Sequence, residues 1–192
     1  KRSHLYAHDV VPLRLKQLLG SLERAGVNKA MITAVCSAKI VHPIESIPRP
    51  DEDILHSFPS GLAVDVVLVD APCSSVGVLR RRPSQRWFIS EKQIISLLPN
   101  LQKEILYDAS KLVKKGGRLV YATCSILPSE NQDVAQWFEY LANNTFEWEP
   151  WDFDEEEWRE FGMRGGKQNW RIILPQANRC DGFFIARWRR RM

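Results

Sequence analysis

The stretch that decides the fold is Val64-Asp65-Val66-Val67-Leu68-Val69-Asp70-Ala71-Pro72-Cys73-Ser74. Its first six residues are nearly all apolar and β-branched, which is typical of a central parallel strand covered on both faces. Pro72 cannot donate to a sheet ladder, so the strand has to stop where Asp70 begins a polar segment. A second apolar stretch ends in the same way, as Tyr121-Ala122-Thr123-Cys124-Ser125. The two stretches predict a parallel α/β sheet.

Strands and helices alternate on both sides of this stretch. The apolar patterns predict further strands over residues 4–7, 30–35, 118–122 and 183–188, and a short one over 146–148. They predict helices from Pro12 to near Gly26, over residues 91–115, and after an N-cap at Ser129.

Prolines and glycines set the expected limits of these elements. Pro99 should split or kink the second helix, and Gly116-Gly117 should end it with Lys114 and Lys115 in its last turn. Residues 37–63 carry four prolines and should form a long connection with little regular structure.

Length and cysteine usage narrow the class of protein. A chain of 192 residues predicts one domain, residues 1–192. It has no apolar run of about 18 residues, so no transmembrane helix is expected. The four cysteines include no C-x-x-C pair and no histidine at zinc-finger spacing, so we expect no metal site. They are too sparse for a disulfide scaffold, which indicates reduced thiols in an intracellular protein.

Charge is modest in total but clustered. Twenty-seven Lys and Arg against 23 Asp and Glu give a net charge of +4, which weakly favours an anionic partner. One basic cluster surrounds a turn and another lies near the C-terminus: Arg80, Arg81, Arg82 and Arg86, then Arg187, Arg189, Arg190 and Arg191. An acidic run spans residues 152–157. Each run can also be read as a solvated loop or tail.

The chemistry is expected at the carboxyl ends of the strands, where open α/β sheets bind ligands. Asp9 ends one strand, and it can bind a ribose hydroxyl or cap the following helix. Cys73 and Cys124 each follow a strand, so two thiols face one cleft beside Asp70 if those strands are neighbours. Such a pair indicates nucleophilic catalysis or redox chemistry, whereas the ordinary alternative is a small buried apolar residue.

Several motifs occur together in one order and carry a resemblance. They are Asp70-Ala71-Pro72-Cys73-Ser74, Arg82-Pro83, Trp87, Ala122-Thr123-Cys124-Ser125, Glu130-Asn131 and Asp181-Gly182-Phe183-Phe184. In these the chain resembles the Sun/Fmu-type RNA (cytosine-5) methyltransferases. The resemblance implies a Rossmann-like class I methyltransferase fold with an antiparallel terminal strand, and S-adenosylmethionine as cofactor.

The resemblance also implies roles for single residues. Cys124 matches the nucleophile that adds to carbon 6 of cytosine, and Cys73 matches the thiol that helps to release the enzyme. Asp70 matches the carboxylate near N3 of the base, and Pro72 shapes that loop. Asp9 matches the acidic residue on the cofactor ribose. Ser37 stands near the place where the family usually offers an aspartate to the adenine.

The resemblance further implies RNA as partner, ribosomal RNA before transfer RNA. Phosphate contacts are expected from Arg80, Arg81, Arg82 and Arg86 because these arginines directly follow the Cys73 loop, and a solvated basic loop is the alternative. The family's glycine-rich cofactor loop is expected before Asp9 and does not occur in these residues. We therefore expect an N-terminally truncated domain that lacks the first strand. An amino-group methyltransferase, a non-catalytic RNA-binding or assembly module, and a thiol redox protein remain alternatives.

Overall fold

The computed structural model describes residues 3–36, 58–145, 147–153, 169–175 and 180–192. Its contacts group the chain into two compact units, Lys1–Leu62 and Ala63–Met192, and each is described by itself. The prediction of a single domain stays a prediction. Within the described ranges, no helix is long and apolar enough to cross a membrane.

The first unit pairs two parallel strands beside one helix. It runs β1 (Leu5–Asp9), α1 (Pro12–Arg24), a 3-10 turn (Lys29–Met31) and β2 (Ile32–Cys36). Leu5 pairs with Ile32 and Asp9 with Cys36, in parallel register. Pro12 starts α1 because the first helical position needs no backbone N–H donor. These elements confirm the predicted strands and helix; of the expected connection, residues 37–57 lie outside the described ranges.

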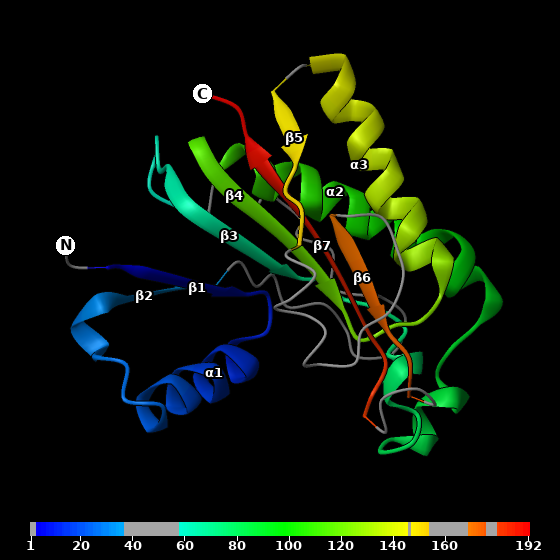
Figure 1. Cartoon of the computed structure of the whole chain (residues 1–192). Helices are drawn as coiled ribbons and strands as arrows, with labels where there is room; N and C mark the ends of the chain where they lie inside the picture. The colour runs from blue at the N-terminus through cyan, green and yellow to red at the C-terminus, as the bar shows by residue number, and fades with distance from the viewer. Residues whose placement is uncertain (1–2, 37–57, 146, 154–168, 176–179) are drawn as a thin grey trace. The chain divides into compact units, whose positions relative to one another are not determined.

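The second unit holds a five-stranded mixed sheet (Figure 1). Its strands are β3 (Val64–Asp70), β4 (Val113–Thr123), β5 (Trp148–Pro150), β6 (Trp170–Ile173) and β7 (Phe183–Arg190). The order is β3-β4-β7-β5, and β6 also pairs with β7. β3 is parallel to β4, and β7 is antiparallel to β4, which confirms the predicted parallel pair and antiparallel terminal strand.

Two helices pack on the sheet and close the core. Figure 1 shows α2 (Leu98–Lys111) and α3 (Gln132–Thr145) on the same side of the sheet. Their apolar residues bury Leu119, Tyr121 and Trp188 of the sheet almost completely. The rings of Phe138 in α3 and Trp188 in β7 have centroids 4.7 Å apart. This packing fixes the strand ends from which the site residues extend.

The prediction that the first quoted strand is covered on both faces is wrong for the described residues. β3 has β4 as its only strand partner in the five-stranded sheet. Val69 faces the core, whereas Val66 and Leu68 are 53% and 65% exposed. An apolar run shows that a strand suits burial, and it does not show which neighbours cover each face.

The limits of two helices differ from the prediction. α2 ends at Lys111 because Val113 is fully buried and starts β4, so Lys114 and Lys115 lie in a strand. A π-helical turn (Gln93–Leu97) precedes α2, which puts Pro99 in the first turn of α2, where a missing N–H costs little. Ser129 does not cap α3. Its hydroxyl donates to the carbonyl of Ile94 at 2.9 Å.

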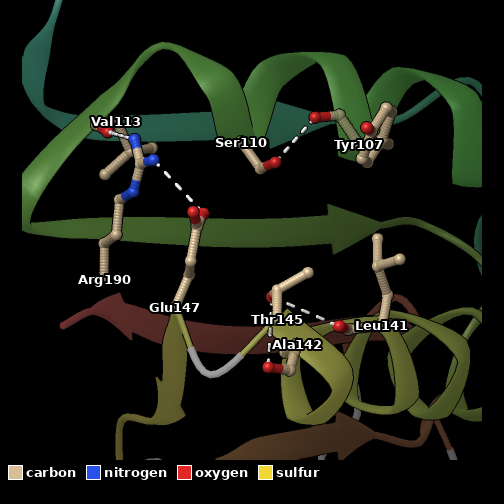
Figure 2. A network of polar contacts seen from close by, with 8 residues as sticks. All are labelled: Tyr107, Ser110, Val113, Leu141, Ala142, Thr145, Glu147 and Arg190. Carbon is tan, nitrogen blue, oxygen red and sulfur yellow. Dashed lines mark hydrogen bonds and ion pairs between the residues drawn. The ribbon is translucent and has the colours of Figure 1, made fainter.

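Three of the four arginines near the C-terminus, Arg187, Arg189 and Arg190, lie in β7 and not in a tail. Arg190 donates to the Val113 carbonyl at 2.6 Å and to Glu147 at 3.2 Å, as Figure 2 shows. Arg187 stacks on the rings of Trp151 and Phe153, 4.0 and 3.8 Å from their centroids. These contacts fasten β7 to β4 and to the segment around β5. Residues 154–157 of the acidic run lie outside the described ranges.

Candidate active site

The two thiols predicted to share a cleft lie side by side. β3 and β4 are parallel neighbours, with Asp70 paired to Ala122, so both following loops leave the same edge of the sheet. The sulfurs of Cys73 and Cys124 are 3.4 Å apart. Neither cysteine is in a disulfide. The predicted convergence of these two thiols is therefore confirmed.

Ser75 brings a hydroxyl to the thiol pair through an unusual backbone conformation. Its φ is 59°, and it is the one non-glycine residue with positive φ among those the structure describes. This left-handed conformation costs on the order of 1–3 kcal/mol and is typical of functional loops. It places Ser75 Oγ 3.3 Å from Cys124 Sγ and 4.0 Å from Cys73 Sγ. No pattern in the sequence signals this role.

The pair divides its protons unequally. The hydrogen bond from Cys73 is the main cause that lowers the pKa of Cys124 from 9.0 to about 6, and Ser75 helps while burial opposes it. The same bond, burial and the negative charges of Cys124 and Glu130 raise the pKa of Cys73. The pair thus favours the thiolate form at Cys124 and the thiol form at Cys73. A thiolate is the nucleophilic form of cysteine.

Two glycines let the loops around the thiols approach closely. The Gly77 N–H donates to the Cys124 carbonyl at 3.0 Å, and the Gly182 N–H donates to the Gly77 carbonyl at 2.8 Å. A Cβ on Gly77 would lie 2.4 Å from the Gly182 carbonyl oxygen. No other residue fits there, so Gly77 and Gly182 have a positioning role that the sequence analysis missed.

The remaining predicted site residues, for which the sequence predicts contacts with the base or the cofactor, lie in different parts of the chain. Asp70 ends β3 and is exposed, at the same sheet edge as the thiols. Pro72 follows it, and the Pro72 carbonyl accepts a hydrogen bond from Gln102 at 2.9 Å. Asp9 ends β1 in the first unit, so its convergence with the thiols stays a prediction. Ser37 lies outside the described residues.

The alternative role of Asp9 as a helix cap can be judged within its own unit. Val11 is the N-cap residue of α1 and receives no side-chain cap bond. Asp9 lies two residues earlier, and its Oδ1 accepts the Val11 N–H at 2.7 Å. Asp9 therefore shapes the turn into α1 without being its cap. Its predicted contact with a ribose stays a prediction.

The arginine cluster after the cysteine loop has two kinds of member. Arg81 Nε donates to Asp181, which is 9% exposed, and Arg80 lies 4.0 Å from the same carboxylate. Arg82 and Arg86 are exposed. Arg86 stacks on Trp87 at 4.5 Å from the ring centroid, and Trp87 is itself 73% exposed. Arg81 thus fastens this turn to the segment before β7, while Arg82 and Arg86 face solvent.

The sequence analysis quoted Glu130 among the motifs but gave no role to its carboxylate, which is the structural centre of this edge. Glu130 is fully buried in a short 3-10 turn (Pro128–Glu130) before α3. Its carboxylate accepts hydrogen bonds from both of the loops that carry the thiols. Within the described ranges no group of three His, Cys, Asp or Glu side chains could hold a metal ion.

Comparisons with known proteins identify the family of the chain. The family model described as 16S rRNA methyltransferase RsmB/F matches residues 1–189. The ribosomal RNA small subunit methyltransferase B of Pasteurella multocida is 34% identical over 190 residues, which cover 98% of this chain and 37% of that protein. The protein named probable ribosomal RNA small subunit methyltransferase B of Synechocystis is 38% identical over 187 residues, which cover 96% of this chain and 37% of that protein.

Solved structures show the same fold. A methyltransferase homologue from Pyrococcus horikoshii is 26% identical with a TM-score of 0.67, over 98% of this chain and 53% of that one. NSun6 from the same organism, with SFG, is 23% identical with a TM-score of 0.70, over 97% and 41%. The fold is that of class I S-adenosylmethionine methyltransferases. The chain spans about 37% of the length of the curated relatives named above. It belongs to the RsmB/F family of 16S rRNA methyltransferases.

Proposed function

We propose that the protein containing this chain methylates carbon 5 of a cytosine in RNA, through a covalent bond between Cys124 and the base. The observation that carries the proposal is the thiol pair: its sulfurs are 3.4 Å apart, and Cys124 has a pKa lowered to about 6. Carbon 5 of cytosine is a weak nucleophile. A thiolate that adds to carbon 6 turns the neighbouring carbon 5 into part of an enamine, which can accept a methyl group.

The residues of the chain suit each proton transfer. As Cys124 Sγ bonds to carbon 6, electron density moves toward N3, which needs a proton. Asp70, at the same sheet edge as the thiols, would hold that proton there. When bound, S-adenosylmethionine supplies the methyl group. A base then removes the proton from carbon 5, the electron pair re-forms the 5,6 double bond, and the carbon–sulfur bond breaks to return Cys124 as thiolate.

Cys73 fits the role of that base because its protonation depends on Cys124. The hydrogen bond to Cys124 and the negative charge of Cys124 are among the causes that raise the pKa of Cys73. Once Cys124 Sγ is bonded to carbon 6 of the cytosine, the sulfur carries no charge and accepts the hydrogen bond from Cys73 less strongly. The pKa of Cys73 then falls, and the thiol becomes able to give up its proton and act as a base at the release step.

Roles in cofactor binding are proposed for single residues of each unit. Asp9 would hold the ribose hydroxyls, since its carboxylate ends a parallel strand of the kind that binds nucleotides. Asp70 and Pro72 would border the methyl donor beside the thiols. Ser37 is proposed as the adenine contact. Because the chemistry depends on free thiols, we expect the protein to work in a reducing, intracellular compartment.

The RNA partner is proposed to be ribosomal RNA, because the curated relatives carry that substrate in their names. Arg80, Arg82 and Arg86 suit phosphate groups, and Trp87 offers an exposed ring on which a base can stack. Arg81 has a weaker claim, because it already bonds Asp181. A target base in a loop leaves its stack at lower cost than one in a duplex.

The test is methyl transfer by the full-length natural protein that contains these 192 residues. RNA is incubated with S-adenosylmethionine labelled in the methyl group, digested to nucleosides and separated by chromatography. We expect label in 5-methylcytidine, and none with Cys124→Ala. Label on an exocyclic amino group would favour an amino-group methyltransferase. RNA binding without any transfer would favour the non-catalytic module.

A further inference from the structure

We propose that Glu130 is the positioning residue of the thiol pair: its buried carboxylate bonds the loops of Cys73 and Cys124 together and so sets the distance between the two sulfurs. The inference deepens the proposed function and rests on it for its catalytic meaning. It can be tested without RNA or cofactor, because it concerns the placement of two thiols.

The carboxylate receives hydrogen bonds from both thiol loops. In the loop after β3, the Ser74 N–H donates to Glu130 Oε1 at 2.7 Å, and the Ser74 hydroxyl donates to Oε2 at 2.5 Å. In the loop after β4, the Ser125 hydroxyl donates to Oε2 at 2.5 Å. Ser74 directly follows Cys73, and Ser125 directly follows Cys124. Each thiol is thus one residue from a group held by the same carboxylate.

A third segment completes the arrangement. Gln102 of α2 donates through Nε2 to Glu130 Oε1 at 3.1 Å and to the Pro72 carbonyl at 2.9 Å. All the groups bonded to the carboxylate are donors, which matches a carboxylate that only accepts. Glu130 is 0% exposed, so bulk water does not compete for these bonds. A buried carboxylate left without them would be costly, so separation of the loops is strongly opposed.

The bonds also explain how the strained conformation at Ser75 persists. Ser75 has φ 59° and follows Ser74 directly. A left-handed serine persists only where its surroundings hold it. Ser74 is fixed to Glu130 through both its backbone and its side chain. Glu130 thereby holds the Ser75 hydroxyl beside Cys124 as well as the two sulfurs beside each other.

Charge alone predicts a different result from positioning. The negative charge of Glu130 is one of the causes that raise the pKa of Cys73, and it is not among the causes that shift the pKa of Cys124. If Glu130 acts only through its field, removing that charge should lower the pKa of Cys73 without raising the pKa of Cys124. If Glu130 positions the loops, removing it weakens the hydrogen bond from Cys73, and the pKa of Cys124 rises. Asp70, the carboxylate that raises the pKa of Cys124, is unchanged in every variant below.

The experiment measures alkylation of Cys124 by iodoacetamide against pH, read by mass spectrometry of the peptide that contains Cys124. Glu130→Gln removes the charge and one acceptor, and Ser125→Ala removes the side-chain bond of the Cys124 loop while leaving the charge. Tyr121→Phe is the matched control, because the Tyr121 hydroxyl donates to the backbone carbonyl of Glu130 at 2.6 Å and does not touch the carboxylate.

We expect the midpoint of the profile to rise from about 6 toward the unshifted value of 9.0 in Glu130→Gln and in Ser125→Ala, and to stay in place in Tyr121→Phe. A midpoint that is unchanged or lower in both variants overturns the proposal. If Glu130→Gln fails to fold, Ser125→Ala decides alone. Methyl transfer is then measured in the full-length protein, where kcat should fall while KM for RNA stays. Absence of the midpoint shift would refute positioning even if methylation by the wild type is confirmed.

Discussion

Replacing Cys73 tests whether that thiol is what makes Cys124 reactive. Cys73→Ala removes the hydrogen bond that is the main cause of the lowered pKa of Cys124. Cys73→Ser keeps a donor at the same place, because a hydroxyl can also donate to a thiolate. The two variants differ by one oxygen atom, so their comparison separates the hydrogen bond from the change in volume.

The size of the effect follows from the two pKa values. The pKa of Cys124 is lowered from 9.0 to about 6, and the bond from Cys73 is the largest cause. In Cys73→Ala we expect a pKa of roughly 8 or higher, because burial then opposes the remaining help from Ser75. The thiolate fraction at pH 7 falls from about 90% to about 10%.

A single rate at pH 7 would hide this change. A thiolate of higher pKa is intrinsically more nucleophilic. A rise of two pKa units increases the nucleophilicity by roughly six- to tenfold, which nearly cancels the effect of the lower thiolate fraction on the rate. The assay is therefore the full pH profile of Cys124 alkylation between about pH 4 and 10. Because a lowered pKa means that the thiolate persists down to about pH 6, wild-type reactivity should fall only below that pH.

The result expected is a midpoint that moves up in Cys73→Ala and stays near 6 in Cys73→Ser. An unmoved midpoint in Cys73→Ala would refute the reasoning, since the thiolate would then owe nothing to its neighbour. Equal upward shifts in both variants would assign the effect to packing around the sulfur and not to the hydrogen bond.

Other parts of the site lead to further expectations. Gly77→Ala should destabilise the protein by about 1–3 kcal/mol in thermal unfolding, because its Cβ would lie 2.4 Å from the Gly182 carbonyl oxygen. The control Gly20→Ala on α1 should be neutral or slightly stabilising, because its Cβ would lie 3.6 Å from the nearest atom. Neutralising Arg80, Arg82 and Arg86 together should reduce the salt dependence of RNA affinity by about 0.7–0.9 in log–log slope for each phosphate that is no longer neutralised, and an unchanged slope would assign these arginines to solubility. Arg81→Gln should lower stability more than Arg86→Gln does, because only Arg81 bonds the buried Asp181.

The sequence was sufficient for the thiol pair because strand ends are easy to place. Apolar β-branched runs that stop at polar residues put Cys73 and Cys124 at one edge once β3 and β4 are neighbours. The antiparallel last strand followed from the resemblance. β6 was missed because its four residues, Trp170–Ile173, are too few to show a period.

What the sequence could not show depends on contacts between distant residues. Glu130 is separated in sequence from Ser74 by 56 residues and from Gln102 by 28, and no local pattern predicts the hydrogen bonds among them. The same holds for the ion pair between Arg81 and Asp181, which are 100 residues apart. The sequence analysis could not foresee this pair, and it therefore grouped Arg81 with the arginines expected to contact RNA phosphates. The early end of α2 reflects the burial of Val113 against its partners, a tertiary effect that outweighs the glycines at 116–117 as a stop signal.

The most direct test of the account is to trap the covalent intermediate in the full-length protein with labelled RNA. Cys73→Ser should still attack and methylate the cytosine but release it slowly, leaving a covalent protein–RNA band on a denaturing gel. Cys124→Ser should give neither methylation nor adduct, because a hydroxyl is a far weaker nucleophile than a thiolate at neutral pH, and the double variant should give no adduct either. An adduct with Cys124→Ser and none with Cys73→Ser would contradict the account and place the nucleophile in the Pro72-Cys73 loop.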